Sequence, residues 1–156
     1  KHLIVIRYPY IIKSTILMNI LFLCVGNSGR SQIAEALAKD MLPNTFDIRS
    51  AGSIPADKVH KDAIQAMSDV GIDISKKTTQ SIDSLEKSFI SSLDYVITLC
   101  AEEVCPVVPE ATKILHWPNE DPDNYKYSDI QSKNAFIKTR ENIFNLLKKF
   151  LIIENL

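Results

Sequence analysis

The chain has 156 residues, a formal net charge of −1 at pH 7 and an apolar content of 46%. This length suffices for one domain with a hydrophobic core, and the dispersed, balanced charges argue against a nucleic-acid partner. The three cysteines form no disulfide framework. They favour a reducing, cytoplasmic location and chemical rather than crosslinking roles.

The first 17 residues are apolar but interrupted. Arg7, Pro9 and Lys13 break the run, so it does not reach the ~20 apolar residues of a membrane span, and no small-residue cleavage pattern marks a signal peptide. We expect no membrane association. We interpret residues 1–17 as an extension upstream of a natural start at Met18, followed by a single domain over residues 18–156.

From Met18 onward, strand-like and helix-like segments alternate. The strands are expected over residues 18–25, 46–51, 94–99 and 113–116. The helices are expected over residues 31–41, 61–70, 79–87 and 129–152. Gly71 follows the second helix as its C-terminal cap. The core stripe of the last helix is expected to comprise Phe136, Ile143, Phe144, Leu147 and Phe150.

This alternation predicts an α/β fold, a three-layer sandwich in which a four-stranded parallel sheet is flanked by helices. Ligands of such sheets bind beyond the carboxyl ends of the strands. Cys24 and Cys100 each follow a predicted strand, so both are expected to open toward one crevice.

The most specific motif is CVGNSGRS, residues 24–31, between the first strand and the first helix. Small residues let several backbone N–H groups turn toward one point, and the helix start adds its positive dipole end. Arg30 offers a charged planar fork to two anion oxygens. In such a field Cys24 is expected to be a thiolate near neutral pH, ready for nucleophilic attack. The expected oxyanion-binding residues are Val25, Gly26, Asn27, Ser28, Gly29, Arg30 and Ser31.

Two residues of this loop have further expected contacts. The Ser31 hydroxyl can hydrogen-bond the Cys24 sulfur, or cap the helix, or do both. Asn27 tolerates left-handed backbone angles and can brace the loop with its amide group.

Cys100 and Cys105 are separated by four residues, and three interpretations remain open. They can form a reversible dithiol pair that accepts oxidation from Cys24, a metal site with His116 as third ligand, or two inert buried thiols. The metal interpretation is the weakest because zinc sites prefer closer cysteine spacing and four ligands. We therefore expect no bound metal or cofactor.

Asp121 lies in a loop after the fourth strand and precedes Pro122. A carboxylic acid at this edge of the sheet can protonate a leaving oxygen. Glu120 and Asp123 are rivals, but neither precedes a proline that fixes its backbone.

With these residues in place, the chain resembles the low-molecular-weight protein tyrosine phosphatase superfamily, and within it the thioredoxin-coupled arsenate reductases. The resemblance rests on ILFLCVGNSGRSQIAEAL near residues 18–38, RSAGS at 49–53, DAIQAMSDVGIDIS at 62–75, DYVITLCAEEVCP at 94–106 and HW…EDP at 116–122. The first motif marks the superfamily, and the cysteine pair points to the reductases.

The resemblance implies a relay. Arsenate binds in the loop, Cys24 attacks arsenic, and Asp121 protonates the departing oxygen. Cys100 then attacks Cys24, releasing arsenite, and Cys105 attacks Cys100. The resulting disulfide is reduced by thioredoxin, an external partner.

The chain departs from its relatives at several positions. Gly29 stands where many carry a second loop cysteine. Asn27, Glu35 and Ser50 match residues near a potassium site of some reductases, but Gln80 replaces an aspartate, which argues against potassium. The tyrosine pair of the phosphatases after Asp-Pro is also absent.

Two other functions stay open. A phosphatase acting on phosphotyrosine, phosphoarginine or a small aryl phosphate would use Cys24, Arg30 and Asp121 with water in place of Cys100. A non-catalytic oxyanion-binding module would keep the loop without turnover.

Overall fold

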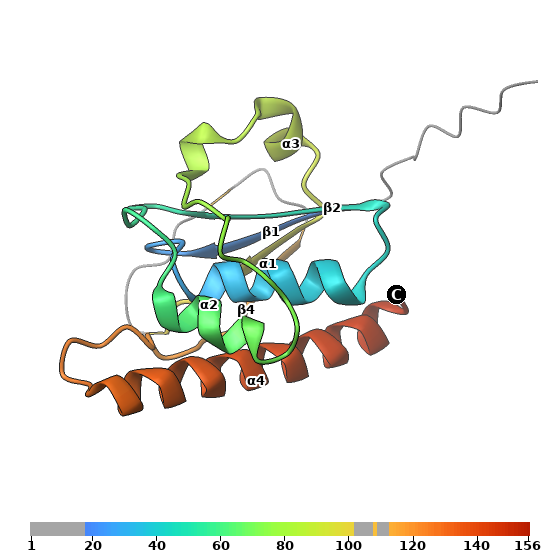
Figure 1. Cartoon of the computed structure of the whole chain (residues 1–156). Helices are drawn as coiled ribbons and strands as arrows, with labels where there is room; N and C mark the ends of the chain where they lie inside the picture. Colours follow the sequence, from blue (N-terminus) through green and yellow to red (C-terminus); the bar gives the residue numbers. More distant parts are fainter. Residues whose placement is uncertain (1–17, 102–107, 109–112) are drawn as a thin grey trace, which may run out of the picture.

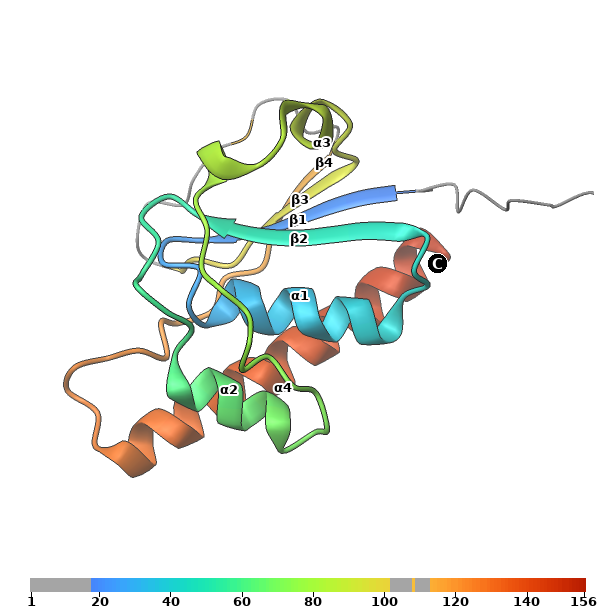
Figure 2. The same cartoon turned by 45° about the horizontal axis from the view of Figure 1, so that its top comes forward.

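The computed structural model describes residues 18–101, 108 and 113–156. Four parallel strands form one sheet in the order β2-β1-β3-β4. The strands are β1 (Met18–Cys24), β2 (Phe46–Gly52), β3 (Tyr95–Thr98) and β4 (Lys113–His116). The helices are α1 (Arg30–Met41), α2 (Lys61–Ser68), the 3₁₀ turn η1 (Ile82–Ser84), α3 (Lys87–Ser91) and α4 (Asp129–Glu154). Figures 1 and 2 show α1, α2 and α4 on one face of the sheet and α3 on the other. The predicted three-layer α/β sandwich is confirmed.

The alternation of side chains along β1 accounts for the layers. Ile20 and Phe22 belong to the larger core, which the sheet shares with α1, α2 and α4. Leu21 and Leu23 belong to a smaller core on the opposite face, closed by Phe89 of α3 and its neighbours. Because both faces are covered, β1 reads as a continuous apolar run in the sequence.

The long helix α4 is fixed at both ends. Ser128 and Gln131 form a reciprocal capping box at its start. Near its end, Glu154 accepts hydrogen bonds from Tyr95 of β3 and Lys113 of β4. Four of the five predicted core-stripe residues are buried, and Phe144 is half-buried at the edge of the core.

The helix predicted over residues 79–87 is wrong. The structure has the short turn η1 and then α3, which begins only at Lys87. The backbone before η1 is committed elsewhere: the Gln80 carbonyl accepts from Gly52 N, and Ser81 bridges to the same residue. These contacts extend the edge beyond β2 and leave no backbone for a helix. Helix α2 ends at Ser68, two residues before the expected end, but the expected capping role of Gly71 agrees with the structure: Gly71 adopts φ +80°, and the amides of Gly71 and Ile72 donate back to the helix.

The strand order has a switch point between β1 and β3, the place where parallel sheets usually bind their ligands. The chain runs from β1 outward to β2 and from β3 outward to β4, so the connections after these two neighbouring strands lead in opposite directions. In parallel sheets such a switch point opens a crevice at the carboxyl ends of the strands. Leu23 pairs with Thr98, so Cys24 and the segment leading to Cys100 emerge side by side.

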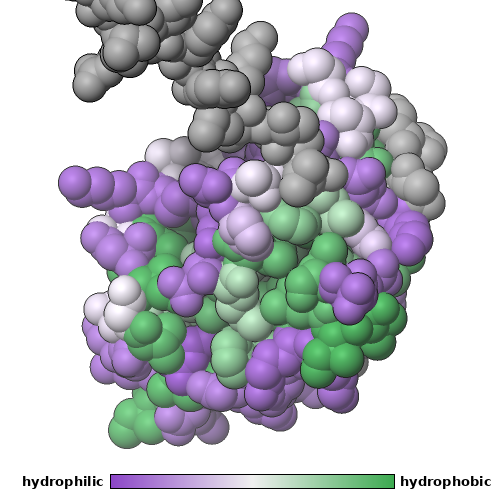
Figure 3. Space-filling view, turned by 90° about the vertical axis from the view of Figure 1, so that its right-hand side faces the viewer, coloured by the Kyte–Doolittle hydropathy of each residue, from purple (hydrophilic) through white to green (hydrophobic). Residues whose placement is uncertain are grey.

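The opposite end of the molecule carries apolar surface. Ile152, Ile153 and Leu156 at the end of α4 are exposed, and Figure 3 shows hydrophobic and polar side chains intermixed on this face. Among the described residues, no helix is both long enough and apolar enough to cross a membrane.

Candidate active site

The loop from Cys24 to Arg30 is held from outside by the segment that follows β2. The carbonyls of Val25, Gly26 and Ser28 accept hydrogen bonds from the amides of Ile54, Ala56 and His60, at 2.8–3.0 Å. In a trans peptide the N–H of the next residue points opposite to the carbonyl. The amides of residues 26, 27 and 29 therefore face the inside of the loop, where an oxyanion can accept from them.

Gly52, at the end of β2, permits this arrangement by close approach. A Cβ atom at Gly52 would lie 2.4 Å from the carbonyl oxygen of Val25 and 3.0 Å from the amide nitrogen of Asn27. Only glycine lets β2 pass this close beneath the loop. The sequence showed Gly52 as the end of a strand but not as a support of the loop.

The Cys24 sulfur lies at the base of the loop, buried and surrounded by donors. The Ser31 hydroxyl is 2.9 Å from Sγ, and the backbone amide of Asn27 donates to Sγ at 3.3 Å. Ser31 lies inside the first turn of α1, whose N-cap is Gly29, so its hydroxyl contacts the sulfur and does not cap the helix. These two contacts hold the sulfur in place at the base of the loop.

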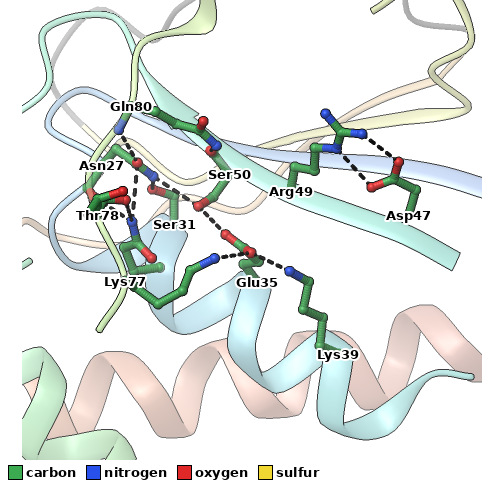
Figure 4. Close-up of polar contacts among 11 residues, drawn as sticks. Asn27, Ser31, Glu35, Lys39, Asp47, Arg49, Ser50, Lys77, Thr78 and Gln80 are labelled. Carbon is green, nitrogen blue, oxygen red and sulfur yellow. Dashed lines mark hydrogen bonds and ion pairs between the residues drawn. The ribbon is translucent and has the colours of Figure 1, made fainter. Parts of the chain in front are cut away.

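Asn27 is the central brace of the loop. Its backbone is left-handed, with φ 49°, and its side chain is fully buried. The amide group donates to Ser31 Oγ at 2.8 Å and to Ser50 Oγ at 3.0 Å, while its Oδ1 accepts from Gln80 N at 2.9 Å. The loop, α1, β2 and the segment after α2 thus meet at one amide side chain, as Figure 4 shows.

A buried carboxylate extends this network. Glu35 of α1 accepts from the Ser50 hydroxyl at 2.5 Å, from Lys39 at 2.6 Å and from Lys77 at 2.7 Å. Burial raises the pKa of Glu35, but the hydrogen bonds from the lysines and Ser50 outweigh it and hold the pKa below its ordinary value. Gln80 donates its side-chain amide to the Ser50 carbonyl and supplies no carboxylate here. The two lysines therefore supply the positive charge that balances the Glu35 carboxylate.

Arg30 lies on the far side of the loop and is buried. Its Nη1 donates to the Asn119 carbonyl at 2.9 Å, and its Nη2 lies 3.6 Å from Asp121 Oδ2. Asn119 is buried as well and fixes the loop after β4 relative to Arg30. The structure thereby brings Asp121 to the mouth of the loop, although Asp121 lies 91 positions after Arg30 in the sequence. Sequence reasoning did not anticipate Asn119.

The loop borders one cavity of about 200 Å³. Cys24, Arg30 and Asp121 share it with the loop backbone. A nucleophilic sulfur, a guanidinium, inward amides and a carboxyl group at the mouth suit a small tetrahedral oxyanion. Gly29 borders Phe136, since a Cβ atom at position 29 would lie 3.0 Å from that ring. A cysteine at this position would therefore require the Phe136 ring to move.

The remaining predicted residues are placed in part. Cys100 is buried, lies two residues beyond β3 and belongs to the same core cluster as Cys24. Cys105 lies outside the described residues. His116 of β4 contacts the Thr98 hydroxyl through Nδ1 at 2.7 Å. Within residues 18–101, 108 and 113–156, no group of three His, Cys, Asp or Glu side chains is arranged to hold a metal.

A comparison with protein-family models matches residues 19–155 to the low molecular weight phosphotyrosine protein phosphatase family. The chain belongs to this family. Arsenate reductases are among the curated relatives: that of Bacillus subtilis is 41% identical over 133 residues, which span 84% of this chain and 93% of the relative.

Solved structures agree with this assignment. An arsenate reductase in the phosphate-binding state superposes with a TM-score of 0.73 at 31% identity, over 87% of this chain and 98% of that chain. The thioredoxin-dependent arsenate reductase of Corynebacterium glutamicum gives a TM-score of 0.63 at 30% identity, over 90% of this chain and 65% of that chain. The family resemblance drawn from the sequence is therefore confirmed.

Proposed function

We propose that the protein is an arsenate reductase that uses thioredoxin as its reductant. The observation that carries the proposal is the buried Cys100 beyond β3, beside the strand that ends in Cys24. Hydrolysis of a phosphocysteine needs only water, whereas reduction needs a second thiol close to the first. The curated arsenate reductases and the thioredoxin-dependent structural relative support the same assignment.

The first step is oxyanion capture. Arsenate accepts hydrogen bonds from the inward amides of the loop and from Arg30, and its arsenic atom faces Cys24. The thiolate forms a sulfur–arsenic bond, and Asp121 donates the proton with which one arsenate oxygen leaves as water.

The second step is the two-electron reduction. The Cys100 thiolate attacks the Cys24 sulfur, the disulfide forms, and the electron pair of the sulfur–arsenic bond stays on arsenic. Arsenic(V) becomes arsenic(III) and is released as arsenite, while the two thiols are oxidised to one disulfide. Cys105 then displaces Cys24 from Cys100, and thioredoxin reduces the Cys100–Cys105 disulfide. No bound metal or cofactor takes part.

The test is arsenate-dependent oxidation of NADPH in the presence of thioredoxin and thioredoxin reductase. We expect the Cys100→Ser variant to lose at least 100-fold of this turnover, while its hydrolysis of p-nitrophenyl phosphate stays within about twofold of the unmodified chain. Cys105→Ser should permit one turnover and block the second. Full multiple turnover by either variant would refute the relay.

A phosphatase is the second candidate, because the same cavity and the Arg30–Asp121 pair suit a phosphate ester and because the family is named for that activity. Absence of arsenate turnover, with equal phosphate hydrolysis by the unmodified chain and Cys100→Ser, would favour it. Oxyanion binding without either turnover would indicate a non-catalytic module.

A further inference from the structure

His60 lies where three parts of the site meet. Its backbone amide donates to the Ser28 carbonyl of the oxyanion loop at 2.8 Å. Its ring is stacked on Phe136 of α4, with centroids 4.5 Å apart and planes at 18°, and Phe136 in turn borders Gly29. The residue is also the N-cap of α2. His60 therefore contacts the loop directly through its backbone, and its ring packs on the Phe136 ring that borders Gly29.

The N-cap contact fixes which ring nitrogen faces outward. Nδ1 of His60 accepts a hydrogen bond from the Asp62 amide at 3.1 Å, so the neutral ring carries its proton on Nε2. Nε2 lies 3.5 Å from Oδ1 of Asp123. The other carboxylate at the ring, Asp62, has its Oδ2 4.0 Å from Nδ1 and accepts from the Ser132 hydroxyl at 2.6 Å. Asp123 thus lies beside Nε2, the nitrogen that carries the hydrogen of the neutral ring.

Asp123 is directly joined to the candidate acid, since its backbone amide donates to Asp121 Oδ1 at 3.1 Å. The loop is attached before Asp121 by Arg30, through the Asn119 carbonyl. After Asp121 it is attached by the Asp123–His60 contact. The Asp121 side chain is 55% exposed, and its contact with Arg30 is long, at 3.6 Å. This ion pair therefore holds the side chain only weakly.

We propose that His60 is a positioning residue for the acid step: through Asp123 it holds the loop that carries Asp121 closed over the oxyanion cavity. This rests on the proposed role of Asp121 as general acid. His60 touches no reacting atom, and its effect is on where the acid stands when the leaving oxygen needs a proton.

Two variants remove the contact in different ways. His60→Asn keeps a good N-cap residue for α2 and loses the nitrogen that faces Asp123. Asp123→Ala leaves the cap and the Phe136 stack in place and keeps the backbone amide that Asp121 accepts from. Asp83→Ala, an exposed acid on η1, is the matched control.

The kinetic readout compares phenyl phosphate with p-nitrophenyl phosphate. Phenoxide is the poorer leaving group, so its departure depends more on a proton from Asp121. Because an exposed polar pair contributes little, we expect kcat on phenyl phosphate to fall about fivefold in both variants, with less than a twofold change on p-nitrophenyl phosphate. The double variant should fall no further than either single one. Asp83→Ala should match the unmodified chain.

A second readout needs no turnover. Hydrogen exchange of the peptide spanning residues 117–128 should be faster in His60→Asn and Asp123→Ala than in the control. Unchanged exchange, or faster exchange with the same loss on both phosphates, would overturn the role of His60. If the unmodified chain turns over neither arsenate nor phosphate esters, the proposed function fails. Hydrogen exchange then tests the role of His60 by itself: faster exchange in the two variants supports it, and unchanged exchange overturns it.

Discussion

Replacement of Gly52 by alanine tests whether close approach of β2 shapes the oxyanion loop. The added Cβ atom would lie 2.4 Å from the Val25 carbonyl oxygen, and contacts below 3.0 Å force a neighbour to shift. Both neighbours are backbone atoms of the loop, so no side chain can rotate out of the way. The Val25 carbonyl must recede by about 0.6 Å, and the inward amide of the next residue moves with it.

The expected cost follows from this geometry. Overpacking of a well-packed site costs roughly 1–3 kcal/mol of unfolding free energy. Misplacement of reacting groups by about 1 Å can cost roughly 100-fold in rate, so a shift of this size should lower arsenate or phosphate-ester turnover about 10- to 100-fold.

Gly71→Ala is the matched control. Gly71 has φ +80° and open space around its Cα, so alanine there is strained without a clash. It should cost about 1 kcal/mol in stability and leave the site intact. Urea unfolding measures stability, and mass-spectrometric alkylation of Cys24, with and without arsenate, measures oxyanion binding. If arsenate protects Cys24 from alkylation at the same concentration in Gly52→Ala as in Gly71→Ala, the reasoning is refuted.

Three further predictions concern the network behind the loop. Glu35→Gln should lower stability at pH 7 by about 1 kcal/mol, since the lysines that bond Glu35 are half-exposed. Because the pKa of Glu35 is lowered on folding, this difference should be full above the unfolded value near ~4.3 and vanish in acid, which urea unfolding across pH 3–7 would show. Asn27→Ala should remove the amide that donates to the Ser31 and Ser50 hydroxyls and the oxygen that accepts from Gln80 N, and cost roughly 1–3 kcal/mol in the same assay; an unchanged midpoint would contradict it. Ser31→Ala should slow alkylation of Cys24 several-fold because the sulfur loses the hydroxyl 2.9 Å away, and equal rates would show that this contact does not activate the sulfur.

The sequence was sufficient for the elements whose pattern is local. β1 is a continuous apolar run, α4 has a capping residue and an apolar stripe, and Gly71 ends α2. Each depends on neighbours in the chain, so periodicity and capping preferences predict it. The segment over residues 79–87 failed because its backbone bonds to Gly52, far away in the sequence, and local propensity cannot register such a partner.

The site divides in the same way. The motif at residues 24–31 was recognisable by itself, since loop, thiol and guanidinium are contiguous. Their arrangement was not: the parallel sheet brings Asn119 and Asp121 to Arg30, and Gly52 beneath Val25. The inward turn of the loop amides, the buried charge of Glu35 and the place of His60 beside Asp123 come from packing between elements distant in the chain. The sequence determined which groups are available for chemistry, and the tertiary structure decided how they face one another, because distances between remote segments are set only when the sheet and helices close around the core.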